Sequence, residues 1–461
     1  MLFNSNLYLI FLAAVAGLYF ILPFKWRSSL LLAASFAFYM KWSVSLVAII
    51  IYIILLNYAA AIVISRQKRE SVRKAILAGA VIGNLSPLFT FKYLDFALRS
   101  TGWILNADSW PALNLVVPIG ISFYTFKALS YTIDVYRRKM EADYSLLETA
   151  LYIIFFPQLL SGPIMRAPDL IAEFRKATRP DLDRFTQGAL IIAGGLVKKV
   201  VIADTIARYV NEVFAAPGEF SGATLLAASY GFTLQIYLDF SGYTDIANGT
   251  CRLLGINPME NFNKPYLSRS FQEFWRRWHI SLSSWLRDYL YISLGGNRKG
   301  RYRTYLNILI TMLLGGLWHG ANYTFVVWGG LHGLALAVER WVNDLRGRSE
   351  AHGLVGVWVR RLLVFHVVSL LWVFFRADNI SDAYALISGV ITWEAGKALG
   401  WWPVYLLLGY MAYEVLGQYR SLPSLLMRRP MLVRWIVYAV LAFMVVIFSE
   451  ARSQEFIYFK F

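Results

Sequence analysis

The chain has 461 residues, of which 58% are hydrophobic and only 16% are charged, and its formal net charge is +17. Soluble domains carry about 25% charged residues, so this composition excludes an ordinary soluble protein and indicates an integral membrane protein. In so apolar a chain, the basic excess is typical of cytoplasmic loops facing anionic headgroups rather than of nucleic-acid binding. The single cysteine, Cys251, excludes an internal disulfide and any CxxC metal or redox site.

Long uncharged stretches predict membrane spans along the whole chain. Residues 42–65 contain no charged side chain, and about 20 apolar residues suffice to cross roughly 30 Å of hydrocarbon. The first stretch lacks a basic leader and a cleavage pattern, so it is expected to be a retained span rather than a signal peptide. The predicted spans are 6–24, 28–40, 43–65, 75–92, 112–134, 147–163, 187–203, 221–240, 305–338 as a broken pair, 361–376, 401–417 and 432–450. With no linker or repeat, residues 1–461 are predicted to form one polytopic membrane domain.

Basic stretches predict the orientation, because Lys and Arg concentrate in cytoplasmic loops. These stretches are residues 66–74, 136–139, 264–304, 340–361 and 418–434. They place segment 264–304 in the cytoplasm and both termini outside.

A basic amphipathic helix is predicted over residues 270–291. Its apolar side chains recur at steps that confine them to one arc of roughly 120°. They are Phe271, Phe274, Trp275, Trp278, Leu282, Trp285, Leu286 and Tyr289. The helix is expected to lie in the membrane interface, with its tryptophans at headgroup depth and His279 at the edge of the apolar arc.

His319 lies in a run, residues 304–338, that contains no Asp, Glu, Lys or Arg. As one straight helix this run would be about 50 Å long, too long for a single crossing, so a break is expected. Gly315, Gly316 and Gly320 are predicted to supply that break. Broken helices at membrane depth are tolerated where protein buries them or where they line a wet cavity, so His319 is expected to face a polar tunnel. The alternative is a histidine satisfied by a neighbouring helix.

The other histidines are weaker candidates: His332 is predicted to be core, His352 to be solvated in a basic loop, and His366 to be an ordinary span residue. The sequence contains no HExxH or similar metal-ligand spacing, no GxSxG elbow and no GxxxxGK[ST] loop. A histidine base acting on an external hydroxyl is sufficient to move an acyl group from a thioester to that hydroxyl, and it needs no nucleophilic Ser or Cys in the protein.

Seven stretches in order along the chain carry a family pattern. They are 118–137, 155–166 ("FFPQLLSGPIMR"), 235–247, 260–300 (with "WRRWHISLS"), 313–333 (with "LWHGA"), 372–377 and the terminal "FIYFKF". Together they resemble the membrane-bound O-acyltransferase family, and most closely its bacterial alginate O-acetyltransferase branch. The resemblance implies an all-α integral membrane fold, a multi-span helical bundle with re-entrant and interfacial amphipathic helices around a central tunnel. It also implies that His319 is the catalytic base and His279 a second functional position.

By the same resemblance, an acyl thioester such as acetyl-CoA enters from the cytoplasm and an acceptor hydroxyl from outside, with no permanently bound cofactor and no metal. The basic helix would suit an anionic donor. The predicted substrate-binding residues are Trp275, Arg277, Trp278, Arg287, Asp288, Trp318 and Asn322. Positive-inside topology is a plainer explanation for the arginines, and an interfacial belt or core packing for the tryptophans. Asp239, Asp245 and Asp288 are candidates to orient a histidine.

The resemblance implies acetyl transfer across a bacterial cytoplasmic membrane to an extracytoplasmic acetyltransferase partner, which modifies a polysaccharide such as alginate, cellulose or peptidoglycan. Membrane lipid is an expected partner, and nucleic acid is not. One alternative is D-alanyl transfer from a carrier protein to teichoic acid, although "SLGGNRKGR" at 293–301 fits the alginate-type branch better. The other is a transporter with a path through Lys127, Asp134, Lys198 and Asp204, but no matching broken segments occur in two halves.

Overall fold

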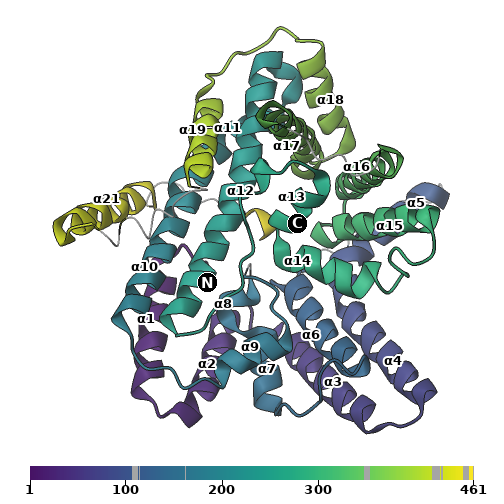
Figure 1. The fold of residues 1–461 in the computed structure, drawn as a ribbon, viewed down its shortest axis with the longest axis vertical. Coiled ribbons are helices and arrows are strands. Elements are labelled where there is room, and N and C mark those ends of the chain that lie inside the picture. The colour runs from purple at the N-terminus through teal and green to yellow at the C-terminus, as the bar shows by residue number, and fades with distance from the viewer. Residues whose placement is uncertain are drawn as a thin grey trace. The chain divides into compact units, whose positions relative to one another are not determined.

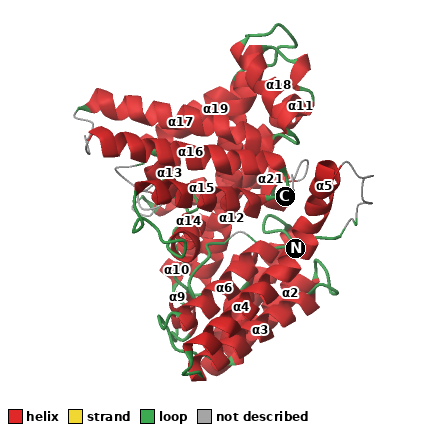
Figure 2. Cartoon of the chain, turned by 90° about the vertical axis from the view of Figure 1, so that its right-hand side faces the viewer, coloured by secondary structure: helices red, strands yellow, loops and turns green. Residues whose placement is uncertain are grey.

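The computed structural model describes residues 1–105, 113, 115–160, 162–346, 353–417, 426, 429–449 and 456–459. Within these residues the chain is built of helices and loops, with one isolated bridge between Phe220 and Lys397 and no strand (Figure 2). The predicted all-helical class is therefore confirmed. The predicted basic stretches 340–361 and 418–434, and the ends of the predicted spans at 112 and 450, lie partly outside the described residues.

The chain divides into two compact units. Unit 1 comprises Met1–Ile192 and Ile246–Met259, and unit 2 comprises Ala193–Asp245 and Glu260–Phe461. The helices that begin in unit 1 are α1 (Asn6–Ile21), α2 (Phe24–Met40), α3 (Val47–Arg66), α4 (Glu70–Leu88), the π-helical turn η1 (Phe89–Tyr93), α5 (Leu94–Leu105), α6 (Ile121–Tyr136), α7 (Leu146–Ile154), α8 (Phe156–Leu159), α9 (Ala167–Phe174) and α10 (Leu182–Leu196).

The elements that begin in unit 2 lie between Val197 and Phe459. They are the π-helical turn η2 (Val197–Ala203), α11 (Asp204–Ala215), η3 (Pro217–Glu219), α12 (Gly222–Leu253), η4 (Pro265–Leu267), α13 (Phe271–Arg277), α14 (Ile280–Trp285), the π-helical turn η5 (Leu286–Tyr291), α15 (Arg301–His319), α16 (Tyr323–Arg346), α17 (Leu354–Arg376), α18 (Ile380–Ile391), α19 (Trp402–Leu416), α21 (Met431–Ser449) and the 3-10 turn η6 (Ile457–Phe459).

Among the residues that the structure describes, four helices are long and apolar enough to cross a membrane. They cover Val47–Arg66, Glu70–Gly102, Leu354–Arg376 and Met431–Phe448, and Asn6–Ile21 is a shorter apolar helix. These helices correspond to predicted spans, because an uninterrupted apolar run is a strong local signal. The span predicted at 221–240 is the first part of the longer α12, and the one predicted at 112–134 is helical only from Ile121.

In unit 1, α3, α4 and α6 lie side by side (Figure 1) and share one buried polar cluster. Asn57 on α3 and Asn84 on α4 donate to each other's side-chain carbonyl oxygens at 2.8 and 3.0 Å. Thr132 on α6 donates its hydroxyl to Asn57 Oδ1 at 2.7 Å. Hydrogen bonds between helices stabilise packing in a membrane, where apolar faces alone give little preference for protein over lipid.

The prediction of one continuous span at 147–163 is wrong. The nine residues of α7 end at Ile154, and the four-residue α8 follows with Pro157 in its first turn, where the ring cannot donate to a preceding turn. Arg175, directly after α9, ion-pairs with Glu148 in the first turn of α7 at 2.6 Å. The chain between these two residues therefore returns to the end of the unit from which it started.

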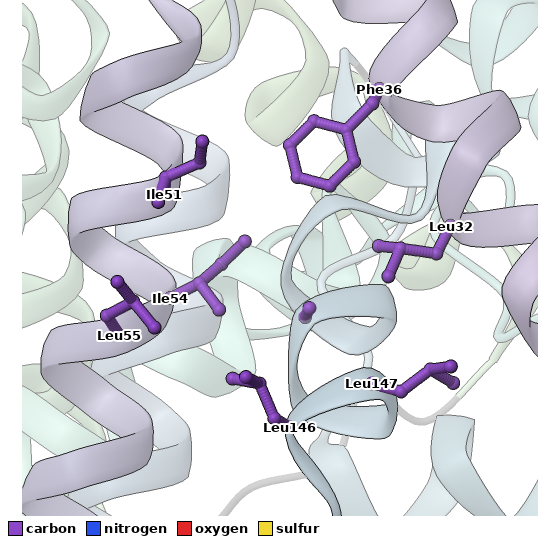
Figure 3. A pocket seen from close by; sticks show the side chains of 8 residues that line it. Leu32, Phe36, Ile51, Ile54, Leu55, Leu146 and Leu147 are labelled. Atoms are coloured by element: carbon purple, nitrogen blue, oxygen red, sulfur yellow. The ribbon is translucent and has the colours of Figure 1, made fainter.

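An apolar hollow of about 470 Å³ lies between α2, α3 and α7 in unit 1 (Figure 3). Its lining is Leu32, Phe36, Ile51, Ile54, Leu55, Leu146, Leu147 and Ala150. None of these side chains can transfer a proton or bind an anion, so this hollow is suited to hydrocarbon and not to chemistry.

The predicted broken pair is confirmed as α15 and α16, which pack closely in unit 2 (Figure 1). The chain breaks between His319 and Tyr323, as expected for Gly320, but Gly315 and Gly316 lie inside α15, so the prediction that they contribute to the break is wrong. A Cβ on Gly316 would overlap the carbonyl oxygen of Phe325, and one on Gly329 would overlap that of Met312. These two glycines instead allow the backbones of the two helices to approach.

Candidate functional site

Three of the five histidines lie buried in one aromatic cluster of unit 2. They are His279, His319 and His332, whose residues are 0%, 4% and 0% exposed. His366 is exposed and contacts the carbonyl oxygen of Leu362 through Nδ1, at 2.6 Å. His352 lies outside the described residues.

His279 occupies a sharp turn between α13 and α14, with φ +41° and ψ 57°. The prediction of a single helix over 270–291 is therefore wrong, and so is the placement of His279 at the edge of its apolar arc. The turn is held from outside the segment: Ile280 N–H donates to the carbonyl oxygen of Asn261 at 2.9 Å, and Ser281 donates from N–H and Oγ to Asn261 Oδ1. A left-handed residue other than glycine costs about 1–2 kcal/mol, and such residues cluster at functional sites.

Aromatic rings surround the His279 imidazole. Phe240 of α12 meets it edge to face at 4.6 Å between ring centroids, and Phe262 stacks at 6.4 Å. Trp318 lies 6.0 Å away. The imidazole thus sits in an apolar environment that disfavours its charged form.

His319 is the last residue of α15 and lies among rings from four parts of unit 2. Its centroid is 4.9 Å from Trp318, 5.2 Å from Trp328 on α16, 5.1 Å from Phe375 on α17 and 5.4 Å from Tyr458 in η6. The break after His319 ends the helix at this point, so the imidazole projects from a helix terminus into the cluster.

The two predicted catalytic histidines are connected through shared ring neighbours, along two paths. Trp318 touches both His279 and His319, at 6.0 and 4.9 Å. Phe240, which touches His279, also meets Tyr458 at 4.4 Å, and Tyr458 touches His319. Two residues predicted from separate motifs are thus brought into one buried cluster.

His332 is buried, as predicted, and packs against Trp328 at 4.8 Å and Trp275 at 5.1 Å. Among the described residues neither of its ring nitrogens has a hydrogen-bond partner. Trp328 contacts both His332 and His319, so His332 belongs to the same cluster.

The predicted substrate-binding residues divide into two groups. Trp275, Trp278 and Trp318 belong to the aromatic cluster, where Trp278 is 1% exposed and packs on Trp372 at 4.9 Å. The charged candidates Arg277, Arg287 and Asp288 instead form ion pairs with neighbouring side chains. Arg277 binds Glu273 at 2.6 Å, and the exposed Arg287 binds Asp288 at 2.8 Å.

Asn322 caps α16. Its Oδ1 accepts a hydrogen bond from the Thr324 N–H at 3.1 Å, and its Nδ2 donates to the carbonyl oxygen of Asp378 at 2.8 Å. An N-terminal cap satisfies an N–H group that the helix itself leaves without a partner. This contact fixes the start of α16 directly after the break at His319.

Two of the three acidic candidates, Asp239 and Asp245, bind lysines. Lys198 pairs with Asp245 at 2.7 Å, and Lys199 pairs with Asp239 at 2.6 Å and with Asp204 at 2.8 Å. These ion pairs also involve Lys198 and Asp204, two of the residues that motivated the transporter alternative, and give them a structural explanation.

Several ring neighbours of the histidines were not predicted, namely Phe240, Trp328, Phe375 and Tyr458. Phe375 and Tyr458 lie in the quoted stretches 372–377 and "FIYFKF", so the sequence marked the segments. No local pattern relates either residue to His319, because the contact joins helices distant in the chain.

Comparison with known proteins adds evidence independent of this geometry. Residues 121–375 match the sequence model of the membrane-bound O-acyltransferase family, and this range contains His279, His319 and His332. The chain is 40% identical over 406 residues to the probable alginate O-acetylase AlgI of Pseudomonas aeruginosa, which covers 86% of this chain and 76% of that protein. It is 34% identical over 423 residues to the peptidoglycan O-acetyltransferase of Helicobacter pylori, covering 85% and 80%. Similarity to the teichoic acid D-alanyltransferase of Bacillus subtilis is 29% over 289 residues, covering 60% and 71%.

Proposed function

Because the chain belongs to the membrane-bound O-acyltransferase family, we propose that it moves an acetyl group from a thioester donor to a hydroxyl acceptor, for O-acetylation of an extracytoplasmic polysaccharide. The observation that carries this proposal is the burial of His279 and His319 in one aromatic cluster of an integral membrane protein. Intramembrane ionisable residues are costly and mark functional sites.

His319 is the general base. Its neutral imidazole removes the proton of the acceptor hydroxyl as the oxygen attacks the thioester carbonyl. The C–S bond then breaks, and the imidazolium returns its proton to the leaving thiolate. The protein supplies no nucleophile, and the rings around His319 keep water from hydrolysing the thioester.

His279 assists from the donor side. The left-handed backbone at His279 persists because Asn261 binds the two residues after it. Such strain lowers the stability of the fold and is typically found at functional sites, which supports a functional role for His279. Trp275, Trp278 and Trp318 form walls of the reaction chamber, and Asn322 positions the start of α16. Arg277 and Arg287 meet the anionic donor at the surface, where Asp288 orients Arg287 through their ion pair.

In the proposed topology the acyl donor enters from the cytoplasm and the acceptor hydroxyl from outside, and a central tunnel connects the two sides. Segment 264–304 faces the cytoplasm, both termini lie outside, and all 461 residues form one membrane domain in a bacterial cytoplasmic membrane. The return of α7–α9 to its starting end supports a re-entrant segment there. No cofactor is held permanently; acetyl-CoA or another acyl thioester is a substrate.

Acetyl transfer is favoured over D-alanyl transfer by the relatives. Those named for O-acetylation are 34–40% identical over 85–86% of the chain, whereas the named D-alanyltransferase is 29% identical over 60%. The final acceptor polymer is reached through an extracytoplasmic acetyltransferase partner.

The direct test measures ester-linked acetate on the polysaccharides of a bacterium that carries this gene. Deletion of the gene should abolish the acetylation, the wild-type gene should restore it, and His319→Ala at equal membrane abundance should not. Unchanged acetate in the deletion strain would refute the proposed function.

A further inference from the structure

We propose that a buried ion triad, Lys199 with Asp204 and Asp239, holds the segment 456–458 against His319, so that this segment forms one wall of the catalytic site. The inference rests on the proposed function for its effect on turnover, and on contacts within unit 2 for its geometry. Lys199, Asp204 and Asp239 are positioning residues, because they act on the site through the segment they hold.

The triad joins three elements of unit 2, namely η2, α11 and α12. The Nζ of Lys199, in the π-helical turn η2, lies 2.8 Å from Asp204 Oδ1 at the start of α11 and 2.6 Å from Asp239 Oδ1 on α12. The side chains of all three are no more than 4% exposed. The neighbouring Lys198 turns to the partly exposed Asp245 instead. π-Helical turns such as η2, which interrupt α-helices, frequently occur at functional sites.

The net charge of the triad explains why it needs a further hydrogen-bond donor. Two carboxylates and one ammonium leave one net negative charge in a buried site, and such a charge is costly unless hydrogen-bond donors compensate it. The backbone N–H of Ile457 donates to Asp239 Oδ2 at 2.8 Å. The terminal segment thus stabilises the triad, and the triad fixes the position of the segment.

Fixing Ile457 places an aromatic residue on each side of it. Phe456 stacks on Tyr243 with centroids 4.2 Å apart, and the Lys199 ammonium lies 5.6 Å from the centre of the same Tyr243 ring. Tyr458 meets Phe240 at 4.4 Å and His319 at 5.4 Å. Holding the Ile457 backbone therefore sets the ring that faces His319, which limits the rotation of the imidazole and closes that side to water.

The sharpest test removes the hydrogen-bond donor at Ile457. Ile457 is the first residue of the 3-10 turn, a position that accepts proline, so Ile457→Pro deletes the N–H donor while keeping the turn. Ile457→Ala keeps the N–H and loses the buried side chain, and is the matched control. We expect Ile457→Pro to lower kcat at least about tenfold relative to Ile457→Ala with little change in the donor KM. Equal kcat for the two variants would overturn the proposal.

A second measurement does not depend on catalysis. In a Cys251→Ala background, the pair Phe456→Cys and Tyr243→Cys should be joined efficiently by a short bifunctional thiol reagent in membranes. Adding Asp239→Asn, which weakens both the ion pair and the acceptor, should lower the yield several-fold, whereas Asp245→Asn should not. An unchanged yield with Asp239→Asn would overturn the proposal. If the cross-linking variants show this dependence while the wild-type chain transfers no acetyl group, only the proposed function is refuted.

Discussion

The ring of Tyr458 packs against the imidazole of His319, with centroids 5.4 Å apart. His319 ends a long helix in unit 2, whereas Tyr458 belongs to the 3-10 turn Ile457–Phe459. Contact with an aromatic face restricts the imidazole and shields one side of it from water. The environment of His319 therefore depends on residues that its own helix does not supply.

Replacing His319 should abolish transfer without unfolding the protein. Loss of a general base typically slows a reaction by about 10²- to 10⁴-fold, and His319→Gln should be as inactive as His319→Ala because an amide does not take up a proton. Acyl transfer would be measured in membranes matched for protein level and thermal stability. Near-normal transfer by His319→Gln would mean that the residue only orients substrate, and His279 would become the first candidate for the base.

Substitutions at His279 can separate its backbone strain from its side chain. His279→Gly and His279→Ala both remove the imidazole, but only glycine adopts φ +41° without strain, so the glycine variant should be more stable by about 1 kcal/mol. Both should turn over more slowly than the wild type. Thermal unfolding in detergent and acetyl transfer are the two readouts.

If a well-expressed His279→Ala protein acetylated normally, His279 would have only a packing role. If the alanine variant were as stable as the glycine variant, the turn would carry no strain.

Close packing of α15 on α16 should be sensitive to one methyl group. Gly316→Ala and Gly329→Ala place a Cβ on a backbone carbonyl oxygen of the facing helix, and overpacking of this kind costs about 1–3 kcal/mol. Gly330→Ala is the control, since its Cβ would meet only a Leu313 side-chain carbon at 3.3 Å. Apparent melting temperatures should fall for the first two variants and change little for the third; equal values would contradict the packing role.

The predicted orientation can be tested with reporter fusions. A reporter fused after residue 300 should be active in the cytoplasm, and one fused at residue 1 should report an external location. A fusion at 300 that reports an external location would reverse the proposed sides for donor and acceptor.

Dependence on a partner is a separate expectation. Expressed in a host that lacks an extracytoplasmic acetyltransferase, the chain should leave polymer acetylation at background, and adding the partner should restore it. Full acetylation in the host without such a protein would show that this chain acts on the polymer alone.

Local sequence was sufficient for the membrane class and for many of the helices. The uncharged run 42–65 became α3, and the run 304–338 broke after His319, because hydrophobic length and the thickness of a bilayer constrain both without reference to neighbours. Short motifs also selected His279 and His319 as the candidate catalytic histidines, since the family pattern lies in contiguous residues.

Periodicity failed where distant groups control the backbone. The apolar spacing of 270–291 indicates one helix, but Asn261 holds the backbone after His279 and leaves His279 in the left-handed region. Likewise, the apolar run 147–163 turns back at α8, and Arg175 after α9 binds Glu148 in the first turn of α7. A pattern of side chains records which faces are apolar, and it carries no information about a hydrogen bond to another segment.

The assembly of the site was decided only in three dimensions. Lys199 and Asp239 are unremarkable as single charges in a sequence, yet Lys199 pairs with one carboxylate oxygen of Asp239 and the other accepts from the backbone N–H of Ile457, whose neighbour Tyr458 contacts His319. Their pairing depends on burial, since the attraction between opposite charges and the penalty for leaving one unpaired both grow as water is excluded. Burial at these positions is a property of the packed helices of unit 2, and no one of those helices determines it alone.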